Sequence, residues 1–174
     1  MTDLAWVMSH GVLRTAHRLV IIFGMVDFPL ACFCSPAVLE TLDPLFFSCP
    51  LAQSILSWLQ ALMLRCSALV PSLACRHVLF GFNQDEFFCV PCIFVYMLNV
   101  CTFFLWQACN DYRFRDVAPI AADVLAKVRV RVRFYLPLFF KRSLSARLRR
   151  FFVRQWGARG VVASVVDGRL VVHL

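Results

Sequence analysis

A stretch without charged residues, 87–110 (FFCVPCIFVYMLNVCTFFLWQACN), constrains the fold of this chain more than any other feature. It reaches the length of about 20 apolar residues that a bilayer-spanning helix needs. The same composition is typical of a central helix in a globular helical domain, which is apolar on every side. Residues that suit a membrane poorly are scattered through it, at Pro91, Asn99, Thr102, Gln107 and Asn110. We therefore favour a buried helix and keep a membrane span as the alternative.

Composition sets the broad class of the protein. The 174 residues suffice for one domain with a core or for two very small ones. Hydrophobic residues make up 61% of the chain, including 18 phenylalanines, which excludes disorder over most of its length. The nine cysteines are odd in number, and no charged segment followed by an apolar core and a cleavage site opens the chain. We expect no secretory signal, and free thiols in place of a disulfide framework.

Charge divides the chain into two parts. Residues 1–112 carry four arginines against seven acidic residues, whereas residues 113–174 carry fourteen Lys and Arg against three acidic residues. This asymmetry predicts an acidic-to-neutral body and a basic tail that meets a polyanion. We accordingly expect a helical region over residues 1–116 and a basic C-terminal tail over residues 117–174.

The body begins with a predicted helix over residues 3–24, which Asp3 can cap and Gly24 can end. Residues 25–50 should be mostly loop, because four prolines punctuate them, at Pro29, Pro36, Pro44 and Pro50. Pro50 suits the first position of a second helix, which Cys49 or Ser48 would cap and which would run to about Cys66. Pro71 should interrupt any helix beyond that point. The residues expected on the buried side of this helix are Leu51, Ile55, Leu59 and Leu62, with Trp58 beside them.

The tail carries two conflicting signals. Residues 128–134 alternate Val and Arg, which is a strand pattern, but Ala-rich residues 120–127 precede them and Pro119 is a good helix start. We favour a helix over 119–135 and predict a second basic, aromatic-lined helix over 139–159. Residues 160–174 alternate Val with small residues around Asp167-Gly168, which predicts a type I′ hairpin. The expected fold is therefore mainly α, with a Cys-rich, knuckle-like loop and a C-terminal β-hairpin.

Three cysteines are candidate metal ligands. Zinc binds four ligands in a tetrahedron, usually Cys thiolates or His nitrogens. Cys32 and Cys34 are one residue apart, and Cys49 follows an acidic turn that holds no histidine. Asp43 is a possible fourth ligand there, through oxygen. The alternative is that these thiols are small buried apolar groups, as we expect for the other six cysteines.

The segment around these cysteines resembles the zinc-binding region that follows the reverse transcriptase domain of non-LTR (LINE-type) retrotransposons. That family shows a Cys pair, a Glu-Ser/Thr dipeptide, a His-Leu-Phe, then x-x-Cys-Pro-x-Ala and a downstream Trp. The matching residues are Cys32, Cys34, Glu40, Thr41, Leu45, Phe46, Cys49, Pro50, Ala52 and Trp58. The family histidine falls on Pro44, whose side chain has no donor atom for a metal. The resemblance thus implies a zinc knuckle that has lost one ligand.

The resemblance covers nearly the whole chain. It is specific over residues 40–58 and 134–174, the latter like the C-terminal end of vertebrate, especially fish, retrotransposon polyproteins, and it is looser between. Other matching segments are Trp6, His10-Gly11, 77–82, 98–101, 110–115 and 154–168. The resemblance implies a C-terminal fragment that binds template RNA or target DNA, in the nucleus or cytoplasm, and a soluble helix at 87–110.

Catalytic motifs are missing from the sequence. It has no Tyr/Phe-x-Asp-Asp carboxylate pair to hold two metal ions for nucleotidyl transfer, and no Walker-type phosphate loop. No Ser–His–Asp or Cys–His arrangement stands out, since the four histidines are far apart in sequence. We predict that this chain is not an enzyme.

The basic tail is the remaining candidate site. Its cations are interleaved with aromatic residues, and arginines contact phosphates while aromatic rings stack on unpaired bases. The expected nucleic-acid-binding residues are Lys141, Arg142, Arg147, Arg149, Arg150, Arg154 and Arg159. A solvated basic face over a core stripe is one alternative, and a basic helix on an anionic membrane is another. For the whole chain, the rivals are a small membrane protein spanning at 87–110 and a translated relic without function.

Overall fold

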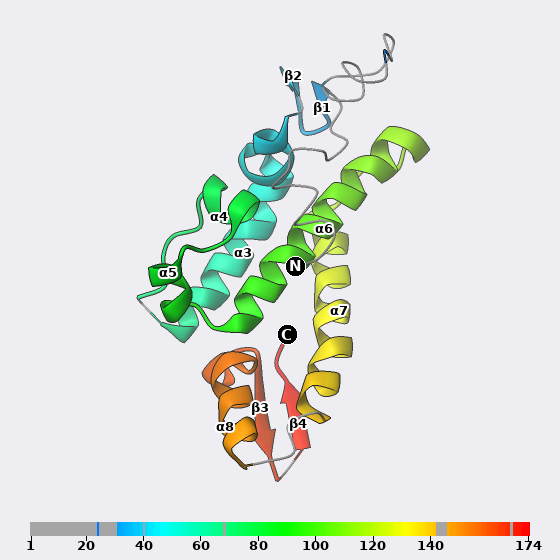
Figure 1. Ribbon diagram of the computed structural model, residues 1–174. Helices are drawn as coiled ribbons and strands as arrows, with labels where there is room; N and C mark the ends of the chain where they lie inside the picture. The colour runs from blue at the N-terminus through cyan, green and yellow to red at the C-terminus, as the bar shows by residue number, and fades with distance from the viewer. Residues whose placement is uncertain (1–23, 25–30, 40, 68, 142–145, 168) are drawn as a thin grey trace.

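The computed structural model describes residues 24, 31–39, 41–67, 69–141, 146–167 and 169–174. It is mainly helical, with two short antiparallel hairpins (Figure 1). The elements in chain order are β1 (Ala31–Cys32), β2 (Ser35–Leu39), η1 (Pro44–Ser48), α3 (Pro50–Cys66), α4 (Cys75–Phe80), α5 (Gln84–Cys89), α6 (Cys92–Arg115), α7 (Ala121–Lys141), α8 (Ala146–Gln155), η2 (Ala158–Gly160), β3 (Ala163–Val166) and β4 (Arg169–Val172). The helix predicted over residues 3–24 lies outside the described residues, apart from Gly24.

Helix α3 confirms the prediction made from its start signals. Pro50 is its first residue, and the Cys49 sulfur caps it by accepting a hydrogen bond from the Ala52 amide at 3.3 Å. The helix ends at Cys66, and no helix forms again among the described residues until Cys75, beyond Pro71. Its predicted buried residues, Leu51, Ile55, Leu59 and Leu62, all lie in the core.

The prediction of a loop over residues 25–50 is wrong in part. Residues 31–39 form the β1–β2 hairpin, and Pro44–Ser48 form a single π-helical turn ahead of α3. Proline is compatible with both elements, because a two-stranded hairpin has only edge strands and the first residues of a helical turn need no N–H partner. The prolines therefore limit these elements to short lengths without preventing them.

The uncharged stretch at 87–110 does not form one continuous helix. Val90 and Pro91 separate α5 from α6, and α6 then continues past the stretch to Arg115. Proline suits this position, because the residue before a proline is disfavoured in helical geometry. Helix α6 lies at the centre of the molecule and packs against α3, η1 and α7 (Figure 1).

Helix α7 settles the conflict between the two tail signals in favour of a helix. Four residues at a spacing of four, Val124, Val128, Val132 and Leu136, are all buried, whereas Val130 on the opposite side is 65% exposed. Burial at a spacing of four residues is the pattern of a helix that packs along one side. The helix extends further than predicted, through Pro137 to Lys141.

The second basic helix predicted over 139–159 is confirmed for Ala146–Gln155 and wrong at both ends. Residues 139–141 belong to α7, α8 covers Ala146–Gln155, and η2 follows after a sharp corner. Gly157 lies at this corner. A larger residue does not fit there, because its Cβ would lie 2.5 Å from the carbonyl oxygen of Ala163. The predicted C-terminal hairpin is confirmed: Val166 pairs with Arg169, and Asp167 has the positive φ of 49° that a type I′ turn requires. Figure 1 shows α7 extending from α6 towards this hairpin and α8.

Candidate nucleic-acid interface

The three candidate metal ligands lie near one another. Cys32 ends β1, Cys34 follows in the tight turn of the hairpin, and Cys49 caps α3. Burial, and to a smaller extent the neighbouring Cys32 and Cys34, raises the pKa of Cys49 to about 12. Cys32 and Cys49 are buried and Cys34 is partly buried. The hairpin thus brings its two thiols to the start of α3, and at neutral pH Cys49 is a protonated thiol.

The candidate fourth ligand, Asp43, is engaged elsewhere. Its carboxylate accepts a hydrogen bond from the Ser48 hydroxyl at 2.6 Å and also hydrogen-bonds the Cys75 thiol, whose pKa burial and Asp43 together raise to about 11. Within the described part of the chain, no group of three or more His, Cys, Asp or Glu side chains has the arrangement of a metal site. The arrangement therefore does not fit four-ligand zinc coordination, and zinc binding remains an expectation of the resemblance alone.

The predicted nucleic-acid-binding residues fall on three elements. Lys141 ends α7, Arg159 lies in η2, and Arg142 is outside the described residues; the remainder are in α8, at Arg147, Arg149, Arg150 and Arg154. The side chains described are those of Arg150 and Arg154, and both are exposed. Because they are four residues apart, they share one face of α8.

Helix α8 is amphipathic. Phe151 is exposed between its two described arginines, whereas Phe152 is buried and packs on Phe140 of α7, with ring centroids 5.3 Å apart. The helix therefore turns an apolar side towards α7 and presents cations and one aromatic ring to solvent. This is an arrangement in which phosphates and unpaired bases can be contacted together.

Helix α7 adds cations that the predicted site left out. Lys127, Arg131 and Arg133 are exposed. Arg129 lies over the Trp58 ring of α3, 5.6 Å from its centroid, and Arg133 donates a hydrogen bond to the Leu174 carbonyl oxygen. The signal was present in the sequence, since residues 127–133 alternate cations with valines and Phe134 and Tyr135 follow directly.

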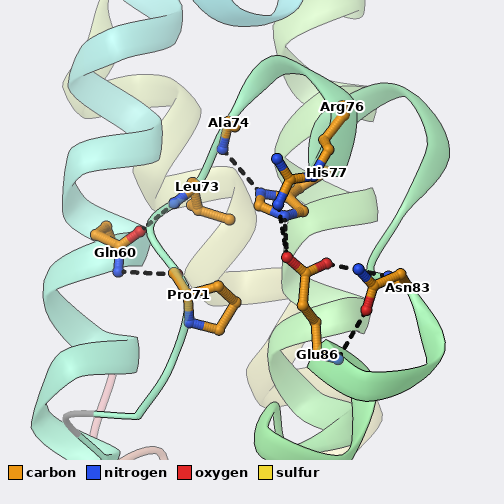
Figure 2. Close-up of polar contacts among 8 residues, drawn as sticks. All are labelled: Gln60, Pro71, Leu73, Ala74, Arg76, His77, Asn83 and Glu86. Atoms are coloured by element: carbon orange, nitrogen blue, oxygen red, sulfur yellow. Dashed lines mark hydrogen bonds and ion pairs between the residues drawn. The ribbon is translucent and has the colours of Figure 1, made fainter.

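A polar cluster joins α4 and α5 on the body (Figure 2). His77 is 1% exposed, and its Nδ1 accepts a hydrogen bond from the Ala74 amide at 2.9 Å. Nε2 therefore carries the proton and donates to Glu86 Oε1 at 3.1 Å. Both ring nitrogens are engaged, so this histidine has no free nitrogen to act as a base or as a metal ligand.

Glu86 is the centre of this cluster. Arg76 Nη2 donates a hydrogen bond to Glu86 Oε1 at 2.7 Å, and the backbone amide of Asn83 donates to Glu86 Oε2 at 3.1 Å (Figure 2). Arg76, then His77 and Asn83, lower the pKa of Glu86 to about 2. The glutamate is also the N3 residue of a capping box, since its own amide donates to the Asn83 side chain at 2.8 Å. The cluster holds two short helices together and is best explained as structural.

Helix α6 is long and apolar enough to cross a membrane by length and composition, and it is the one such helix among the residues the structure describes. In its most apolar window 56% of the residues are buried inside the protein. Ile93, Phe94, Met97, Cys101 and Leu105 are completely buried. The core helix of a globular protein passes the same test of length and composition.

Comparisons of this chain with protein-family models, with curated proteins and with solved structures find no match. The resemblance to retrotransposon proteins therefore rests on the sequence motifs themselves.

Proposed function

We propose that this chain is a non-catalytic nucleic-acid-binding protein, the C-terminal part of a LINE-type retrotransposon protein, and that its basic helices α7 and α8 bind the phosphate backbone. The observation that supports this most is the concentration of unneutralised cations on these two helices. The exposed ones are Lys127, Arg131, Arg150 and Arg154, whereas the exposed Arg133 already donates a hydrogen bond to Leu174. A polyanion is the partner that such a surface attracts.

The pattern of salt bridges supports the same partner. In the described residues, ion pairs occur at Arg76 and Arg115, both before α7. None of the described arginines on α7 and α8 has an acidic partner. The described acids of the tail are Asp167, in the hairpin turn, and Asp123, in the first turn of α7, which is four residues before Lys127 but forms no ion pair with it. The positive charge of this surface is therefore available to a ligand.

The test is the salt dependence of binding. Fluorescence anisotropy with a labelled single-stranded RNA or DNA should give an affinity that falls steeply as salt rises. The reason is that each Lys or Arg that neutralises a phosphate releases counterions from the nucleic acid. Replacing Arg150 and Arg154 by Ala should weaken binding and lower the slope of log K against log salt by about 1.4, at roughly 0.7 per phosphate contact on a single strand. Arg65→Ala, which removes an exposed cation from α3 on the body, is the matched control and should leave the slope unchanged. An unchanged slope in the double variant would remove α8 from the interface.

Two further outcomes would contradict the proposal. Primer extension by the purified chain would show that it is an enzyme. A chain that pellets with membranes and resists carbonate extraction would favour a membrane protein, with α6 as the span. A third measurement addresses the relic hypothesis, which predicts that no cooperative thermal transition is seen.

A further inference from the structure

An aromatic strip joins the two basic helices. The rings of Phe134 and Tyr135 on α7 are 5.3 Å apart, Tyr135 is 6.2 Å from Tyr96 on α6, and Tyr96 is 6.2 Å from Trp156 just beyond α8, all between centroids. Rings at these spacings are in contact. The strip therefore links α7, which the predicted site left out, to the end of α8, which the predicted site included.

One end of the strip is open to solvent. Phe134 is 64% exposed, whereas Tyr135, Tyr96 and Trp156 are half-buried. Phe80, Phe114 and Phe151 are exposed to a similar extent, whereas Phe46, Phe94 and Phe152 are buried completely or almost so. The Phe134 ring adds little to the core, so it is available to a ligand with a flat apolar face.

Cations surround the open end. Lys127, Arg131 and Phe134 are spaced at four and three residues and therefore share one face of α7. The Arg131 guanidinium lies over the Tyr135 ring, 4.7 Å from its centroid. Within the described residues, neither of these two cations has an acidic partner. The face thus offers one exposed ring and two positive charges within two turns of helix.

This combination matches a particular form of nucleic acid. Phosphates satisfy the cations, and a base can stack on the ring only if it is unpaired, because a duplex keeps its bases inside the helix. An apolar protein surface would cover Phe134 but would offer no negative charge to Lys127 and Arg131. Charge complementarity therefore favours a single strand over a protein partner.

We propose that Phe134 is a stacking platform for an unpaired base, with Lys127 and Arg131 holding the adjacent phosphates, so that α7 gives this chain a preference for single-stranded nucleic acid. This inference rests on the proposed nucleic-acid binding and adds to it the form of the ligand. The rings of Tyr135, Tyr96 and Trp156 connect Phe134 to the end of α8, which carries the other cations of the proposed interface.

Phe134→Ala tests the stacking step. Loss of one base–aromatic stack should weaken binding to a labelled single-stranded oligonucleotide by about 5- to 100-fold. The salt slope should stay unchanged, because no charge is removed. Affinity for a duplex of the same length, and for heparin as a polyanion without bases, should also be unchanged. Phe134→Trp should restore single-strand binding, since it keeps an aromatic face.

Phe80→Ala is the matched control, since Phe80 is a similarly exposed phenylalanine on α4 of the body and should have no effect on binding. Both positions are exposed, so both variants should keep the thermal transition of the parent chain.

If Arg150→Ala/Arg154→Ala weakens binding while Phe134→Ala binds the single strand as the parent does, the proposed function stands and the stacking inference is wrong. If the parent chain binds no oligonucleotide at low salt, the proposed function itself fails. If Phe134→Ala loses binding to vesicles of anionic phospholipid but not to oligonucleotides, the face binds a membrane surface and the inference is overturned.

Discussion

The body formed by α3–α6 and the tail formed by α7–β4 use the same aromatic residue differently. In the body, Phe46 and Phe94 are fully buried, and Phe80 is exposed on α4. In the tail, Phe134 and Phe151 are exposed beside arginines. Exposure alone does not separate the two regions, because Phe152 of the tail is buried. What distinguishes Phe134 and Phe151 is that an exposed ring lies beside cations, so a polyanion can reach both.

The strongest test of this contrast removes one ring from each region. Phe94→Ala leaves a cavity in the core beside the first turn of α6 and should cost about 3–5 kcal/mol of unfolding free energy. Phe151→Ala removes an exposed ring and should change it by less than about 0.5 kcal/mol. Urea denaturation followed by circular dichroism measures both values. Equal losses in the two variants would show that the tail depends on its exposed rings for folding.

A second test concerns the polar cluster of the body. The pKa of Glu86 is held at about 2, below its usual value of 4.5. A lowered folded-state pKa stabilises the folded state above the unfolded pKa, and this stabilisation is lost as pH falls. Stability should therefore decrease between about pH 4.5 and pH 2, and Glu86→Gln should make the profile flatter in that window.

Asp85→Asn is the control for the Glu86 variant, because Asp85 is an exposed neighbour on the same short helix. Its profile should follow that of the parent chain. The tail has no comparable network in the described residues, so nucleic-acid binding at pH 7 should be the same in the Glu86→Gln variant. A loss of binding there would mean that the body takes part in the interface.

The smallest expected effect is a difference in reactivity between two thiols, which is measured on the parent chain with its fold and binding intact. Burial raises the pKa of Cys101 to about 12, so its reactive thiolate is scarce at neutral pH. Cys89 is exposed at the end of α5. Iodoacetamide should therefore modify Cys89 much faster than Cys101, as measured by peptide mass spectrometry over time. Faster modification of Cys101 would show that α6 is not buried as described.

Local signals in the sequence predicted much of this fold. The Cys49 cap with Pro50 indicated the start of α3, and Asp167-Gly168 indicated the hairpin, because both depend on the backbone of a few adjacent residues. The end of α8 was missed, since the corner at Gly157 depends on the carbonyl of Ala163, which only the folded chain brings near. The break at Pro91 was overlooked because the absence of charge made residues 87–110 look like one element.

The candidate site was predicted less well than the fold. Composition indicated a basic tail, and α8 carries most of the cations expected to bind nucleic acid. The aromatic strip was not predictable, because the Tyr96–Tyr135 and Tyr96–Trp156 contacts join residues that are far apart in sequence. Spacing also could not show that Asp43 hydrogen-bonds Ser48 and Cys75, since this depends on the packing of α4 against η1.

Nucleic-acid binding through the cations of the tail is the proposal on which the others depend. It is tested by the affinity of the purified chain for a labelled single-stranded oligonucleotide over a series of salt concentrations, beside the Arg150→Ala/Arg154→Ala variant. We predict tight binding at low salt, a steep loss of affinity as salt rises, and a shallower slope in the variant. Binding that is absent at low salt, or equal slopes in the two proteins, would contradict this proposal.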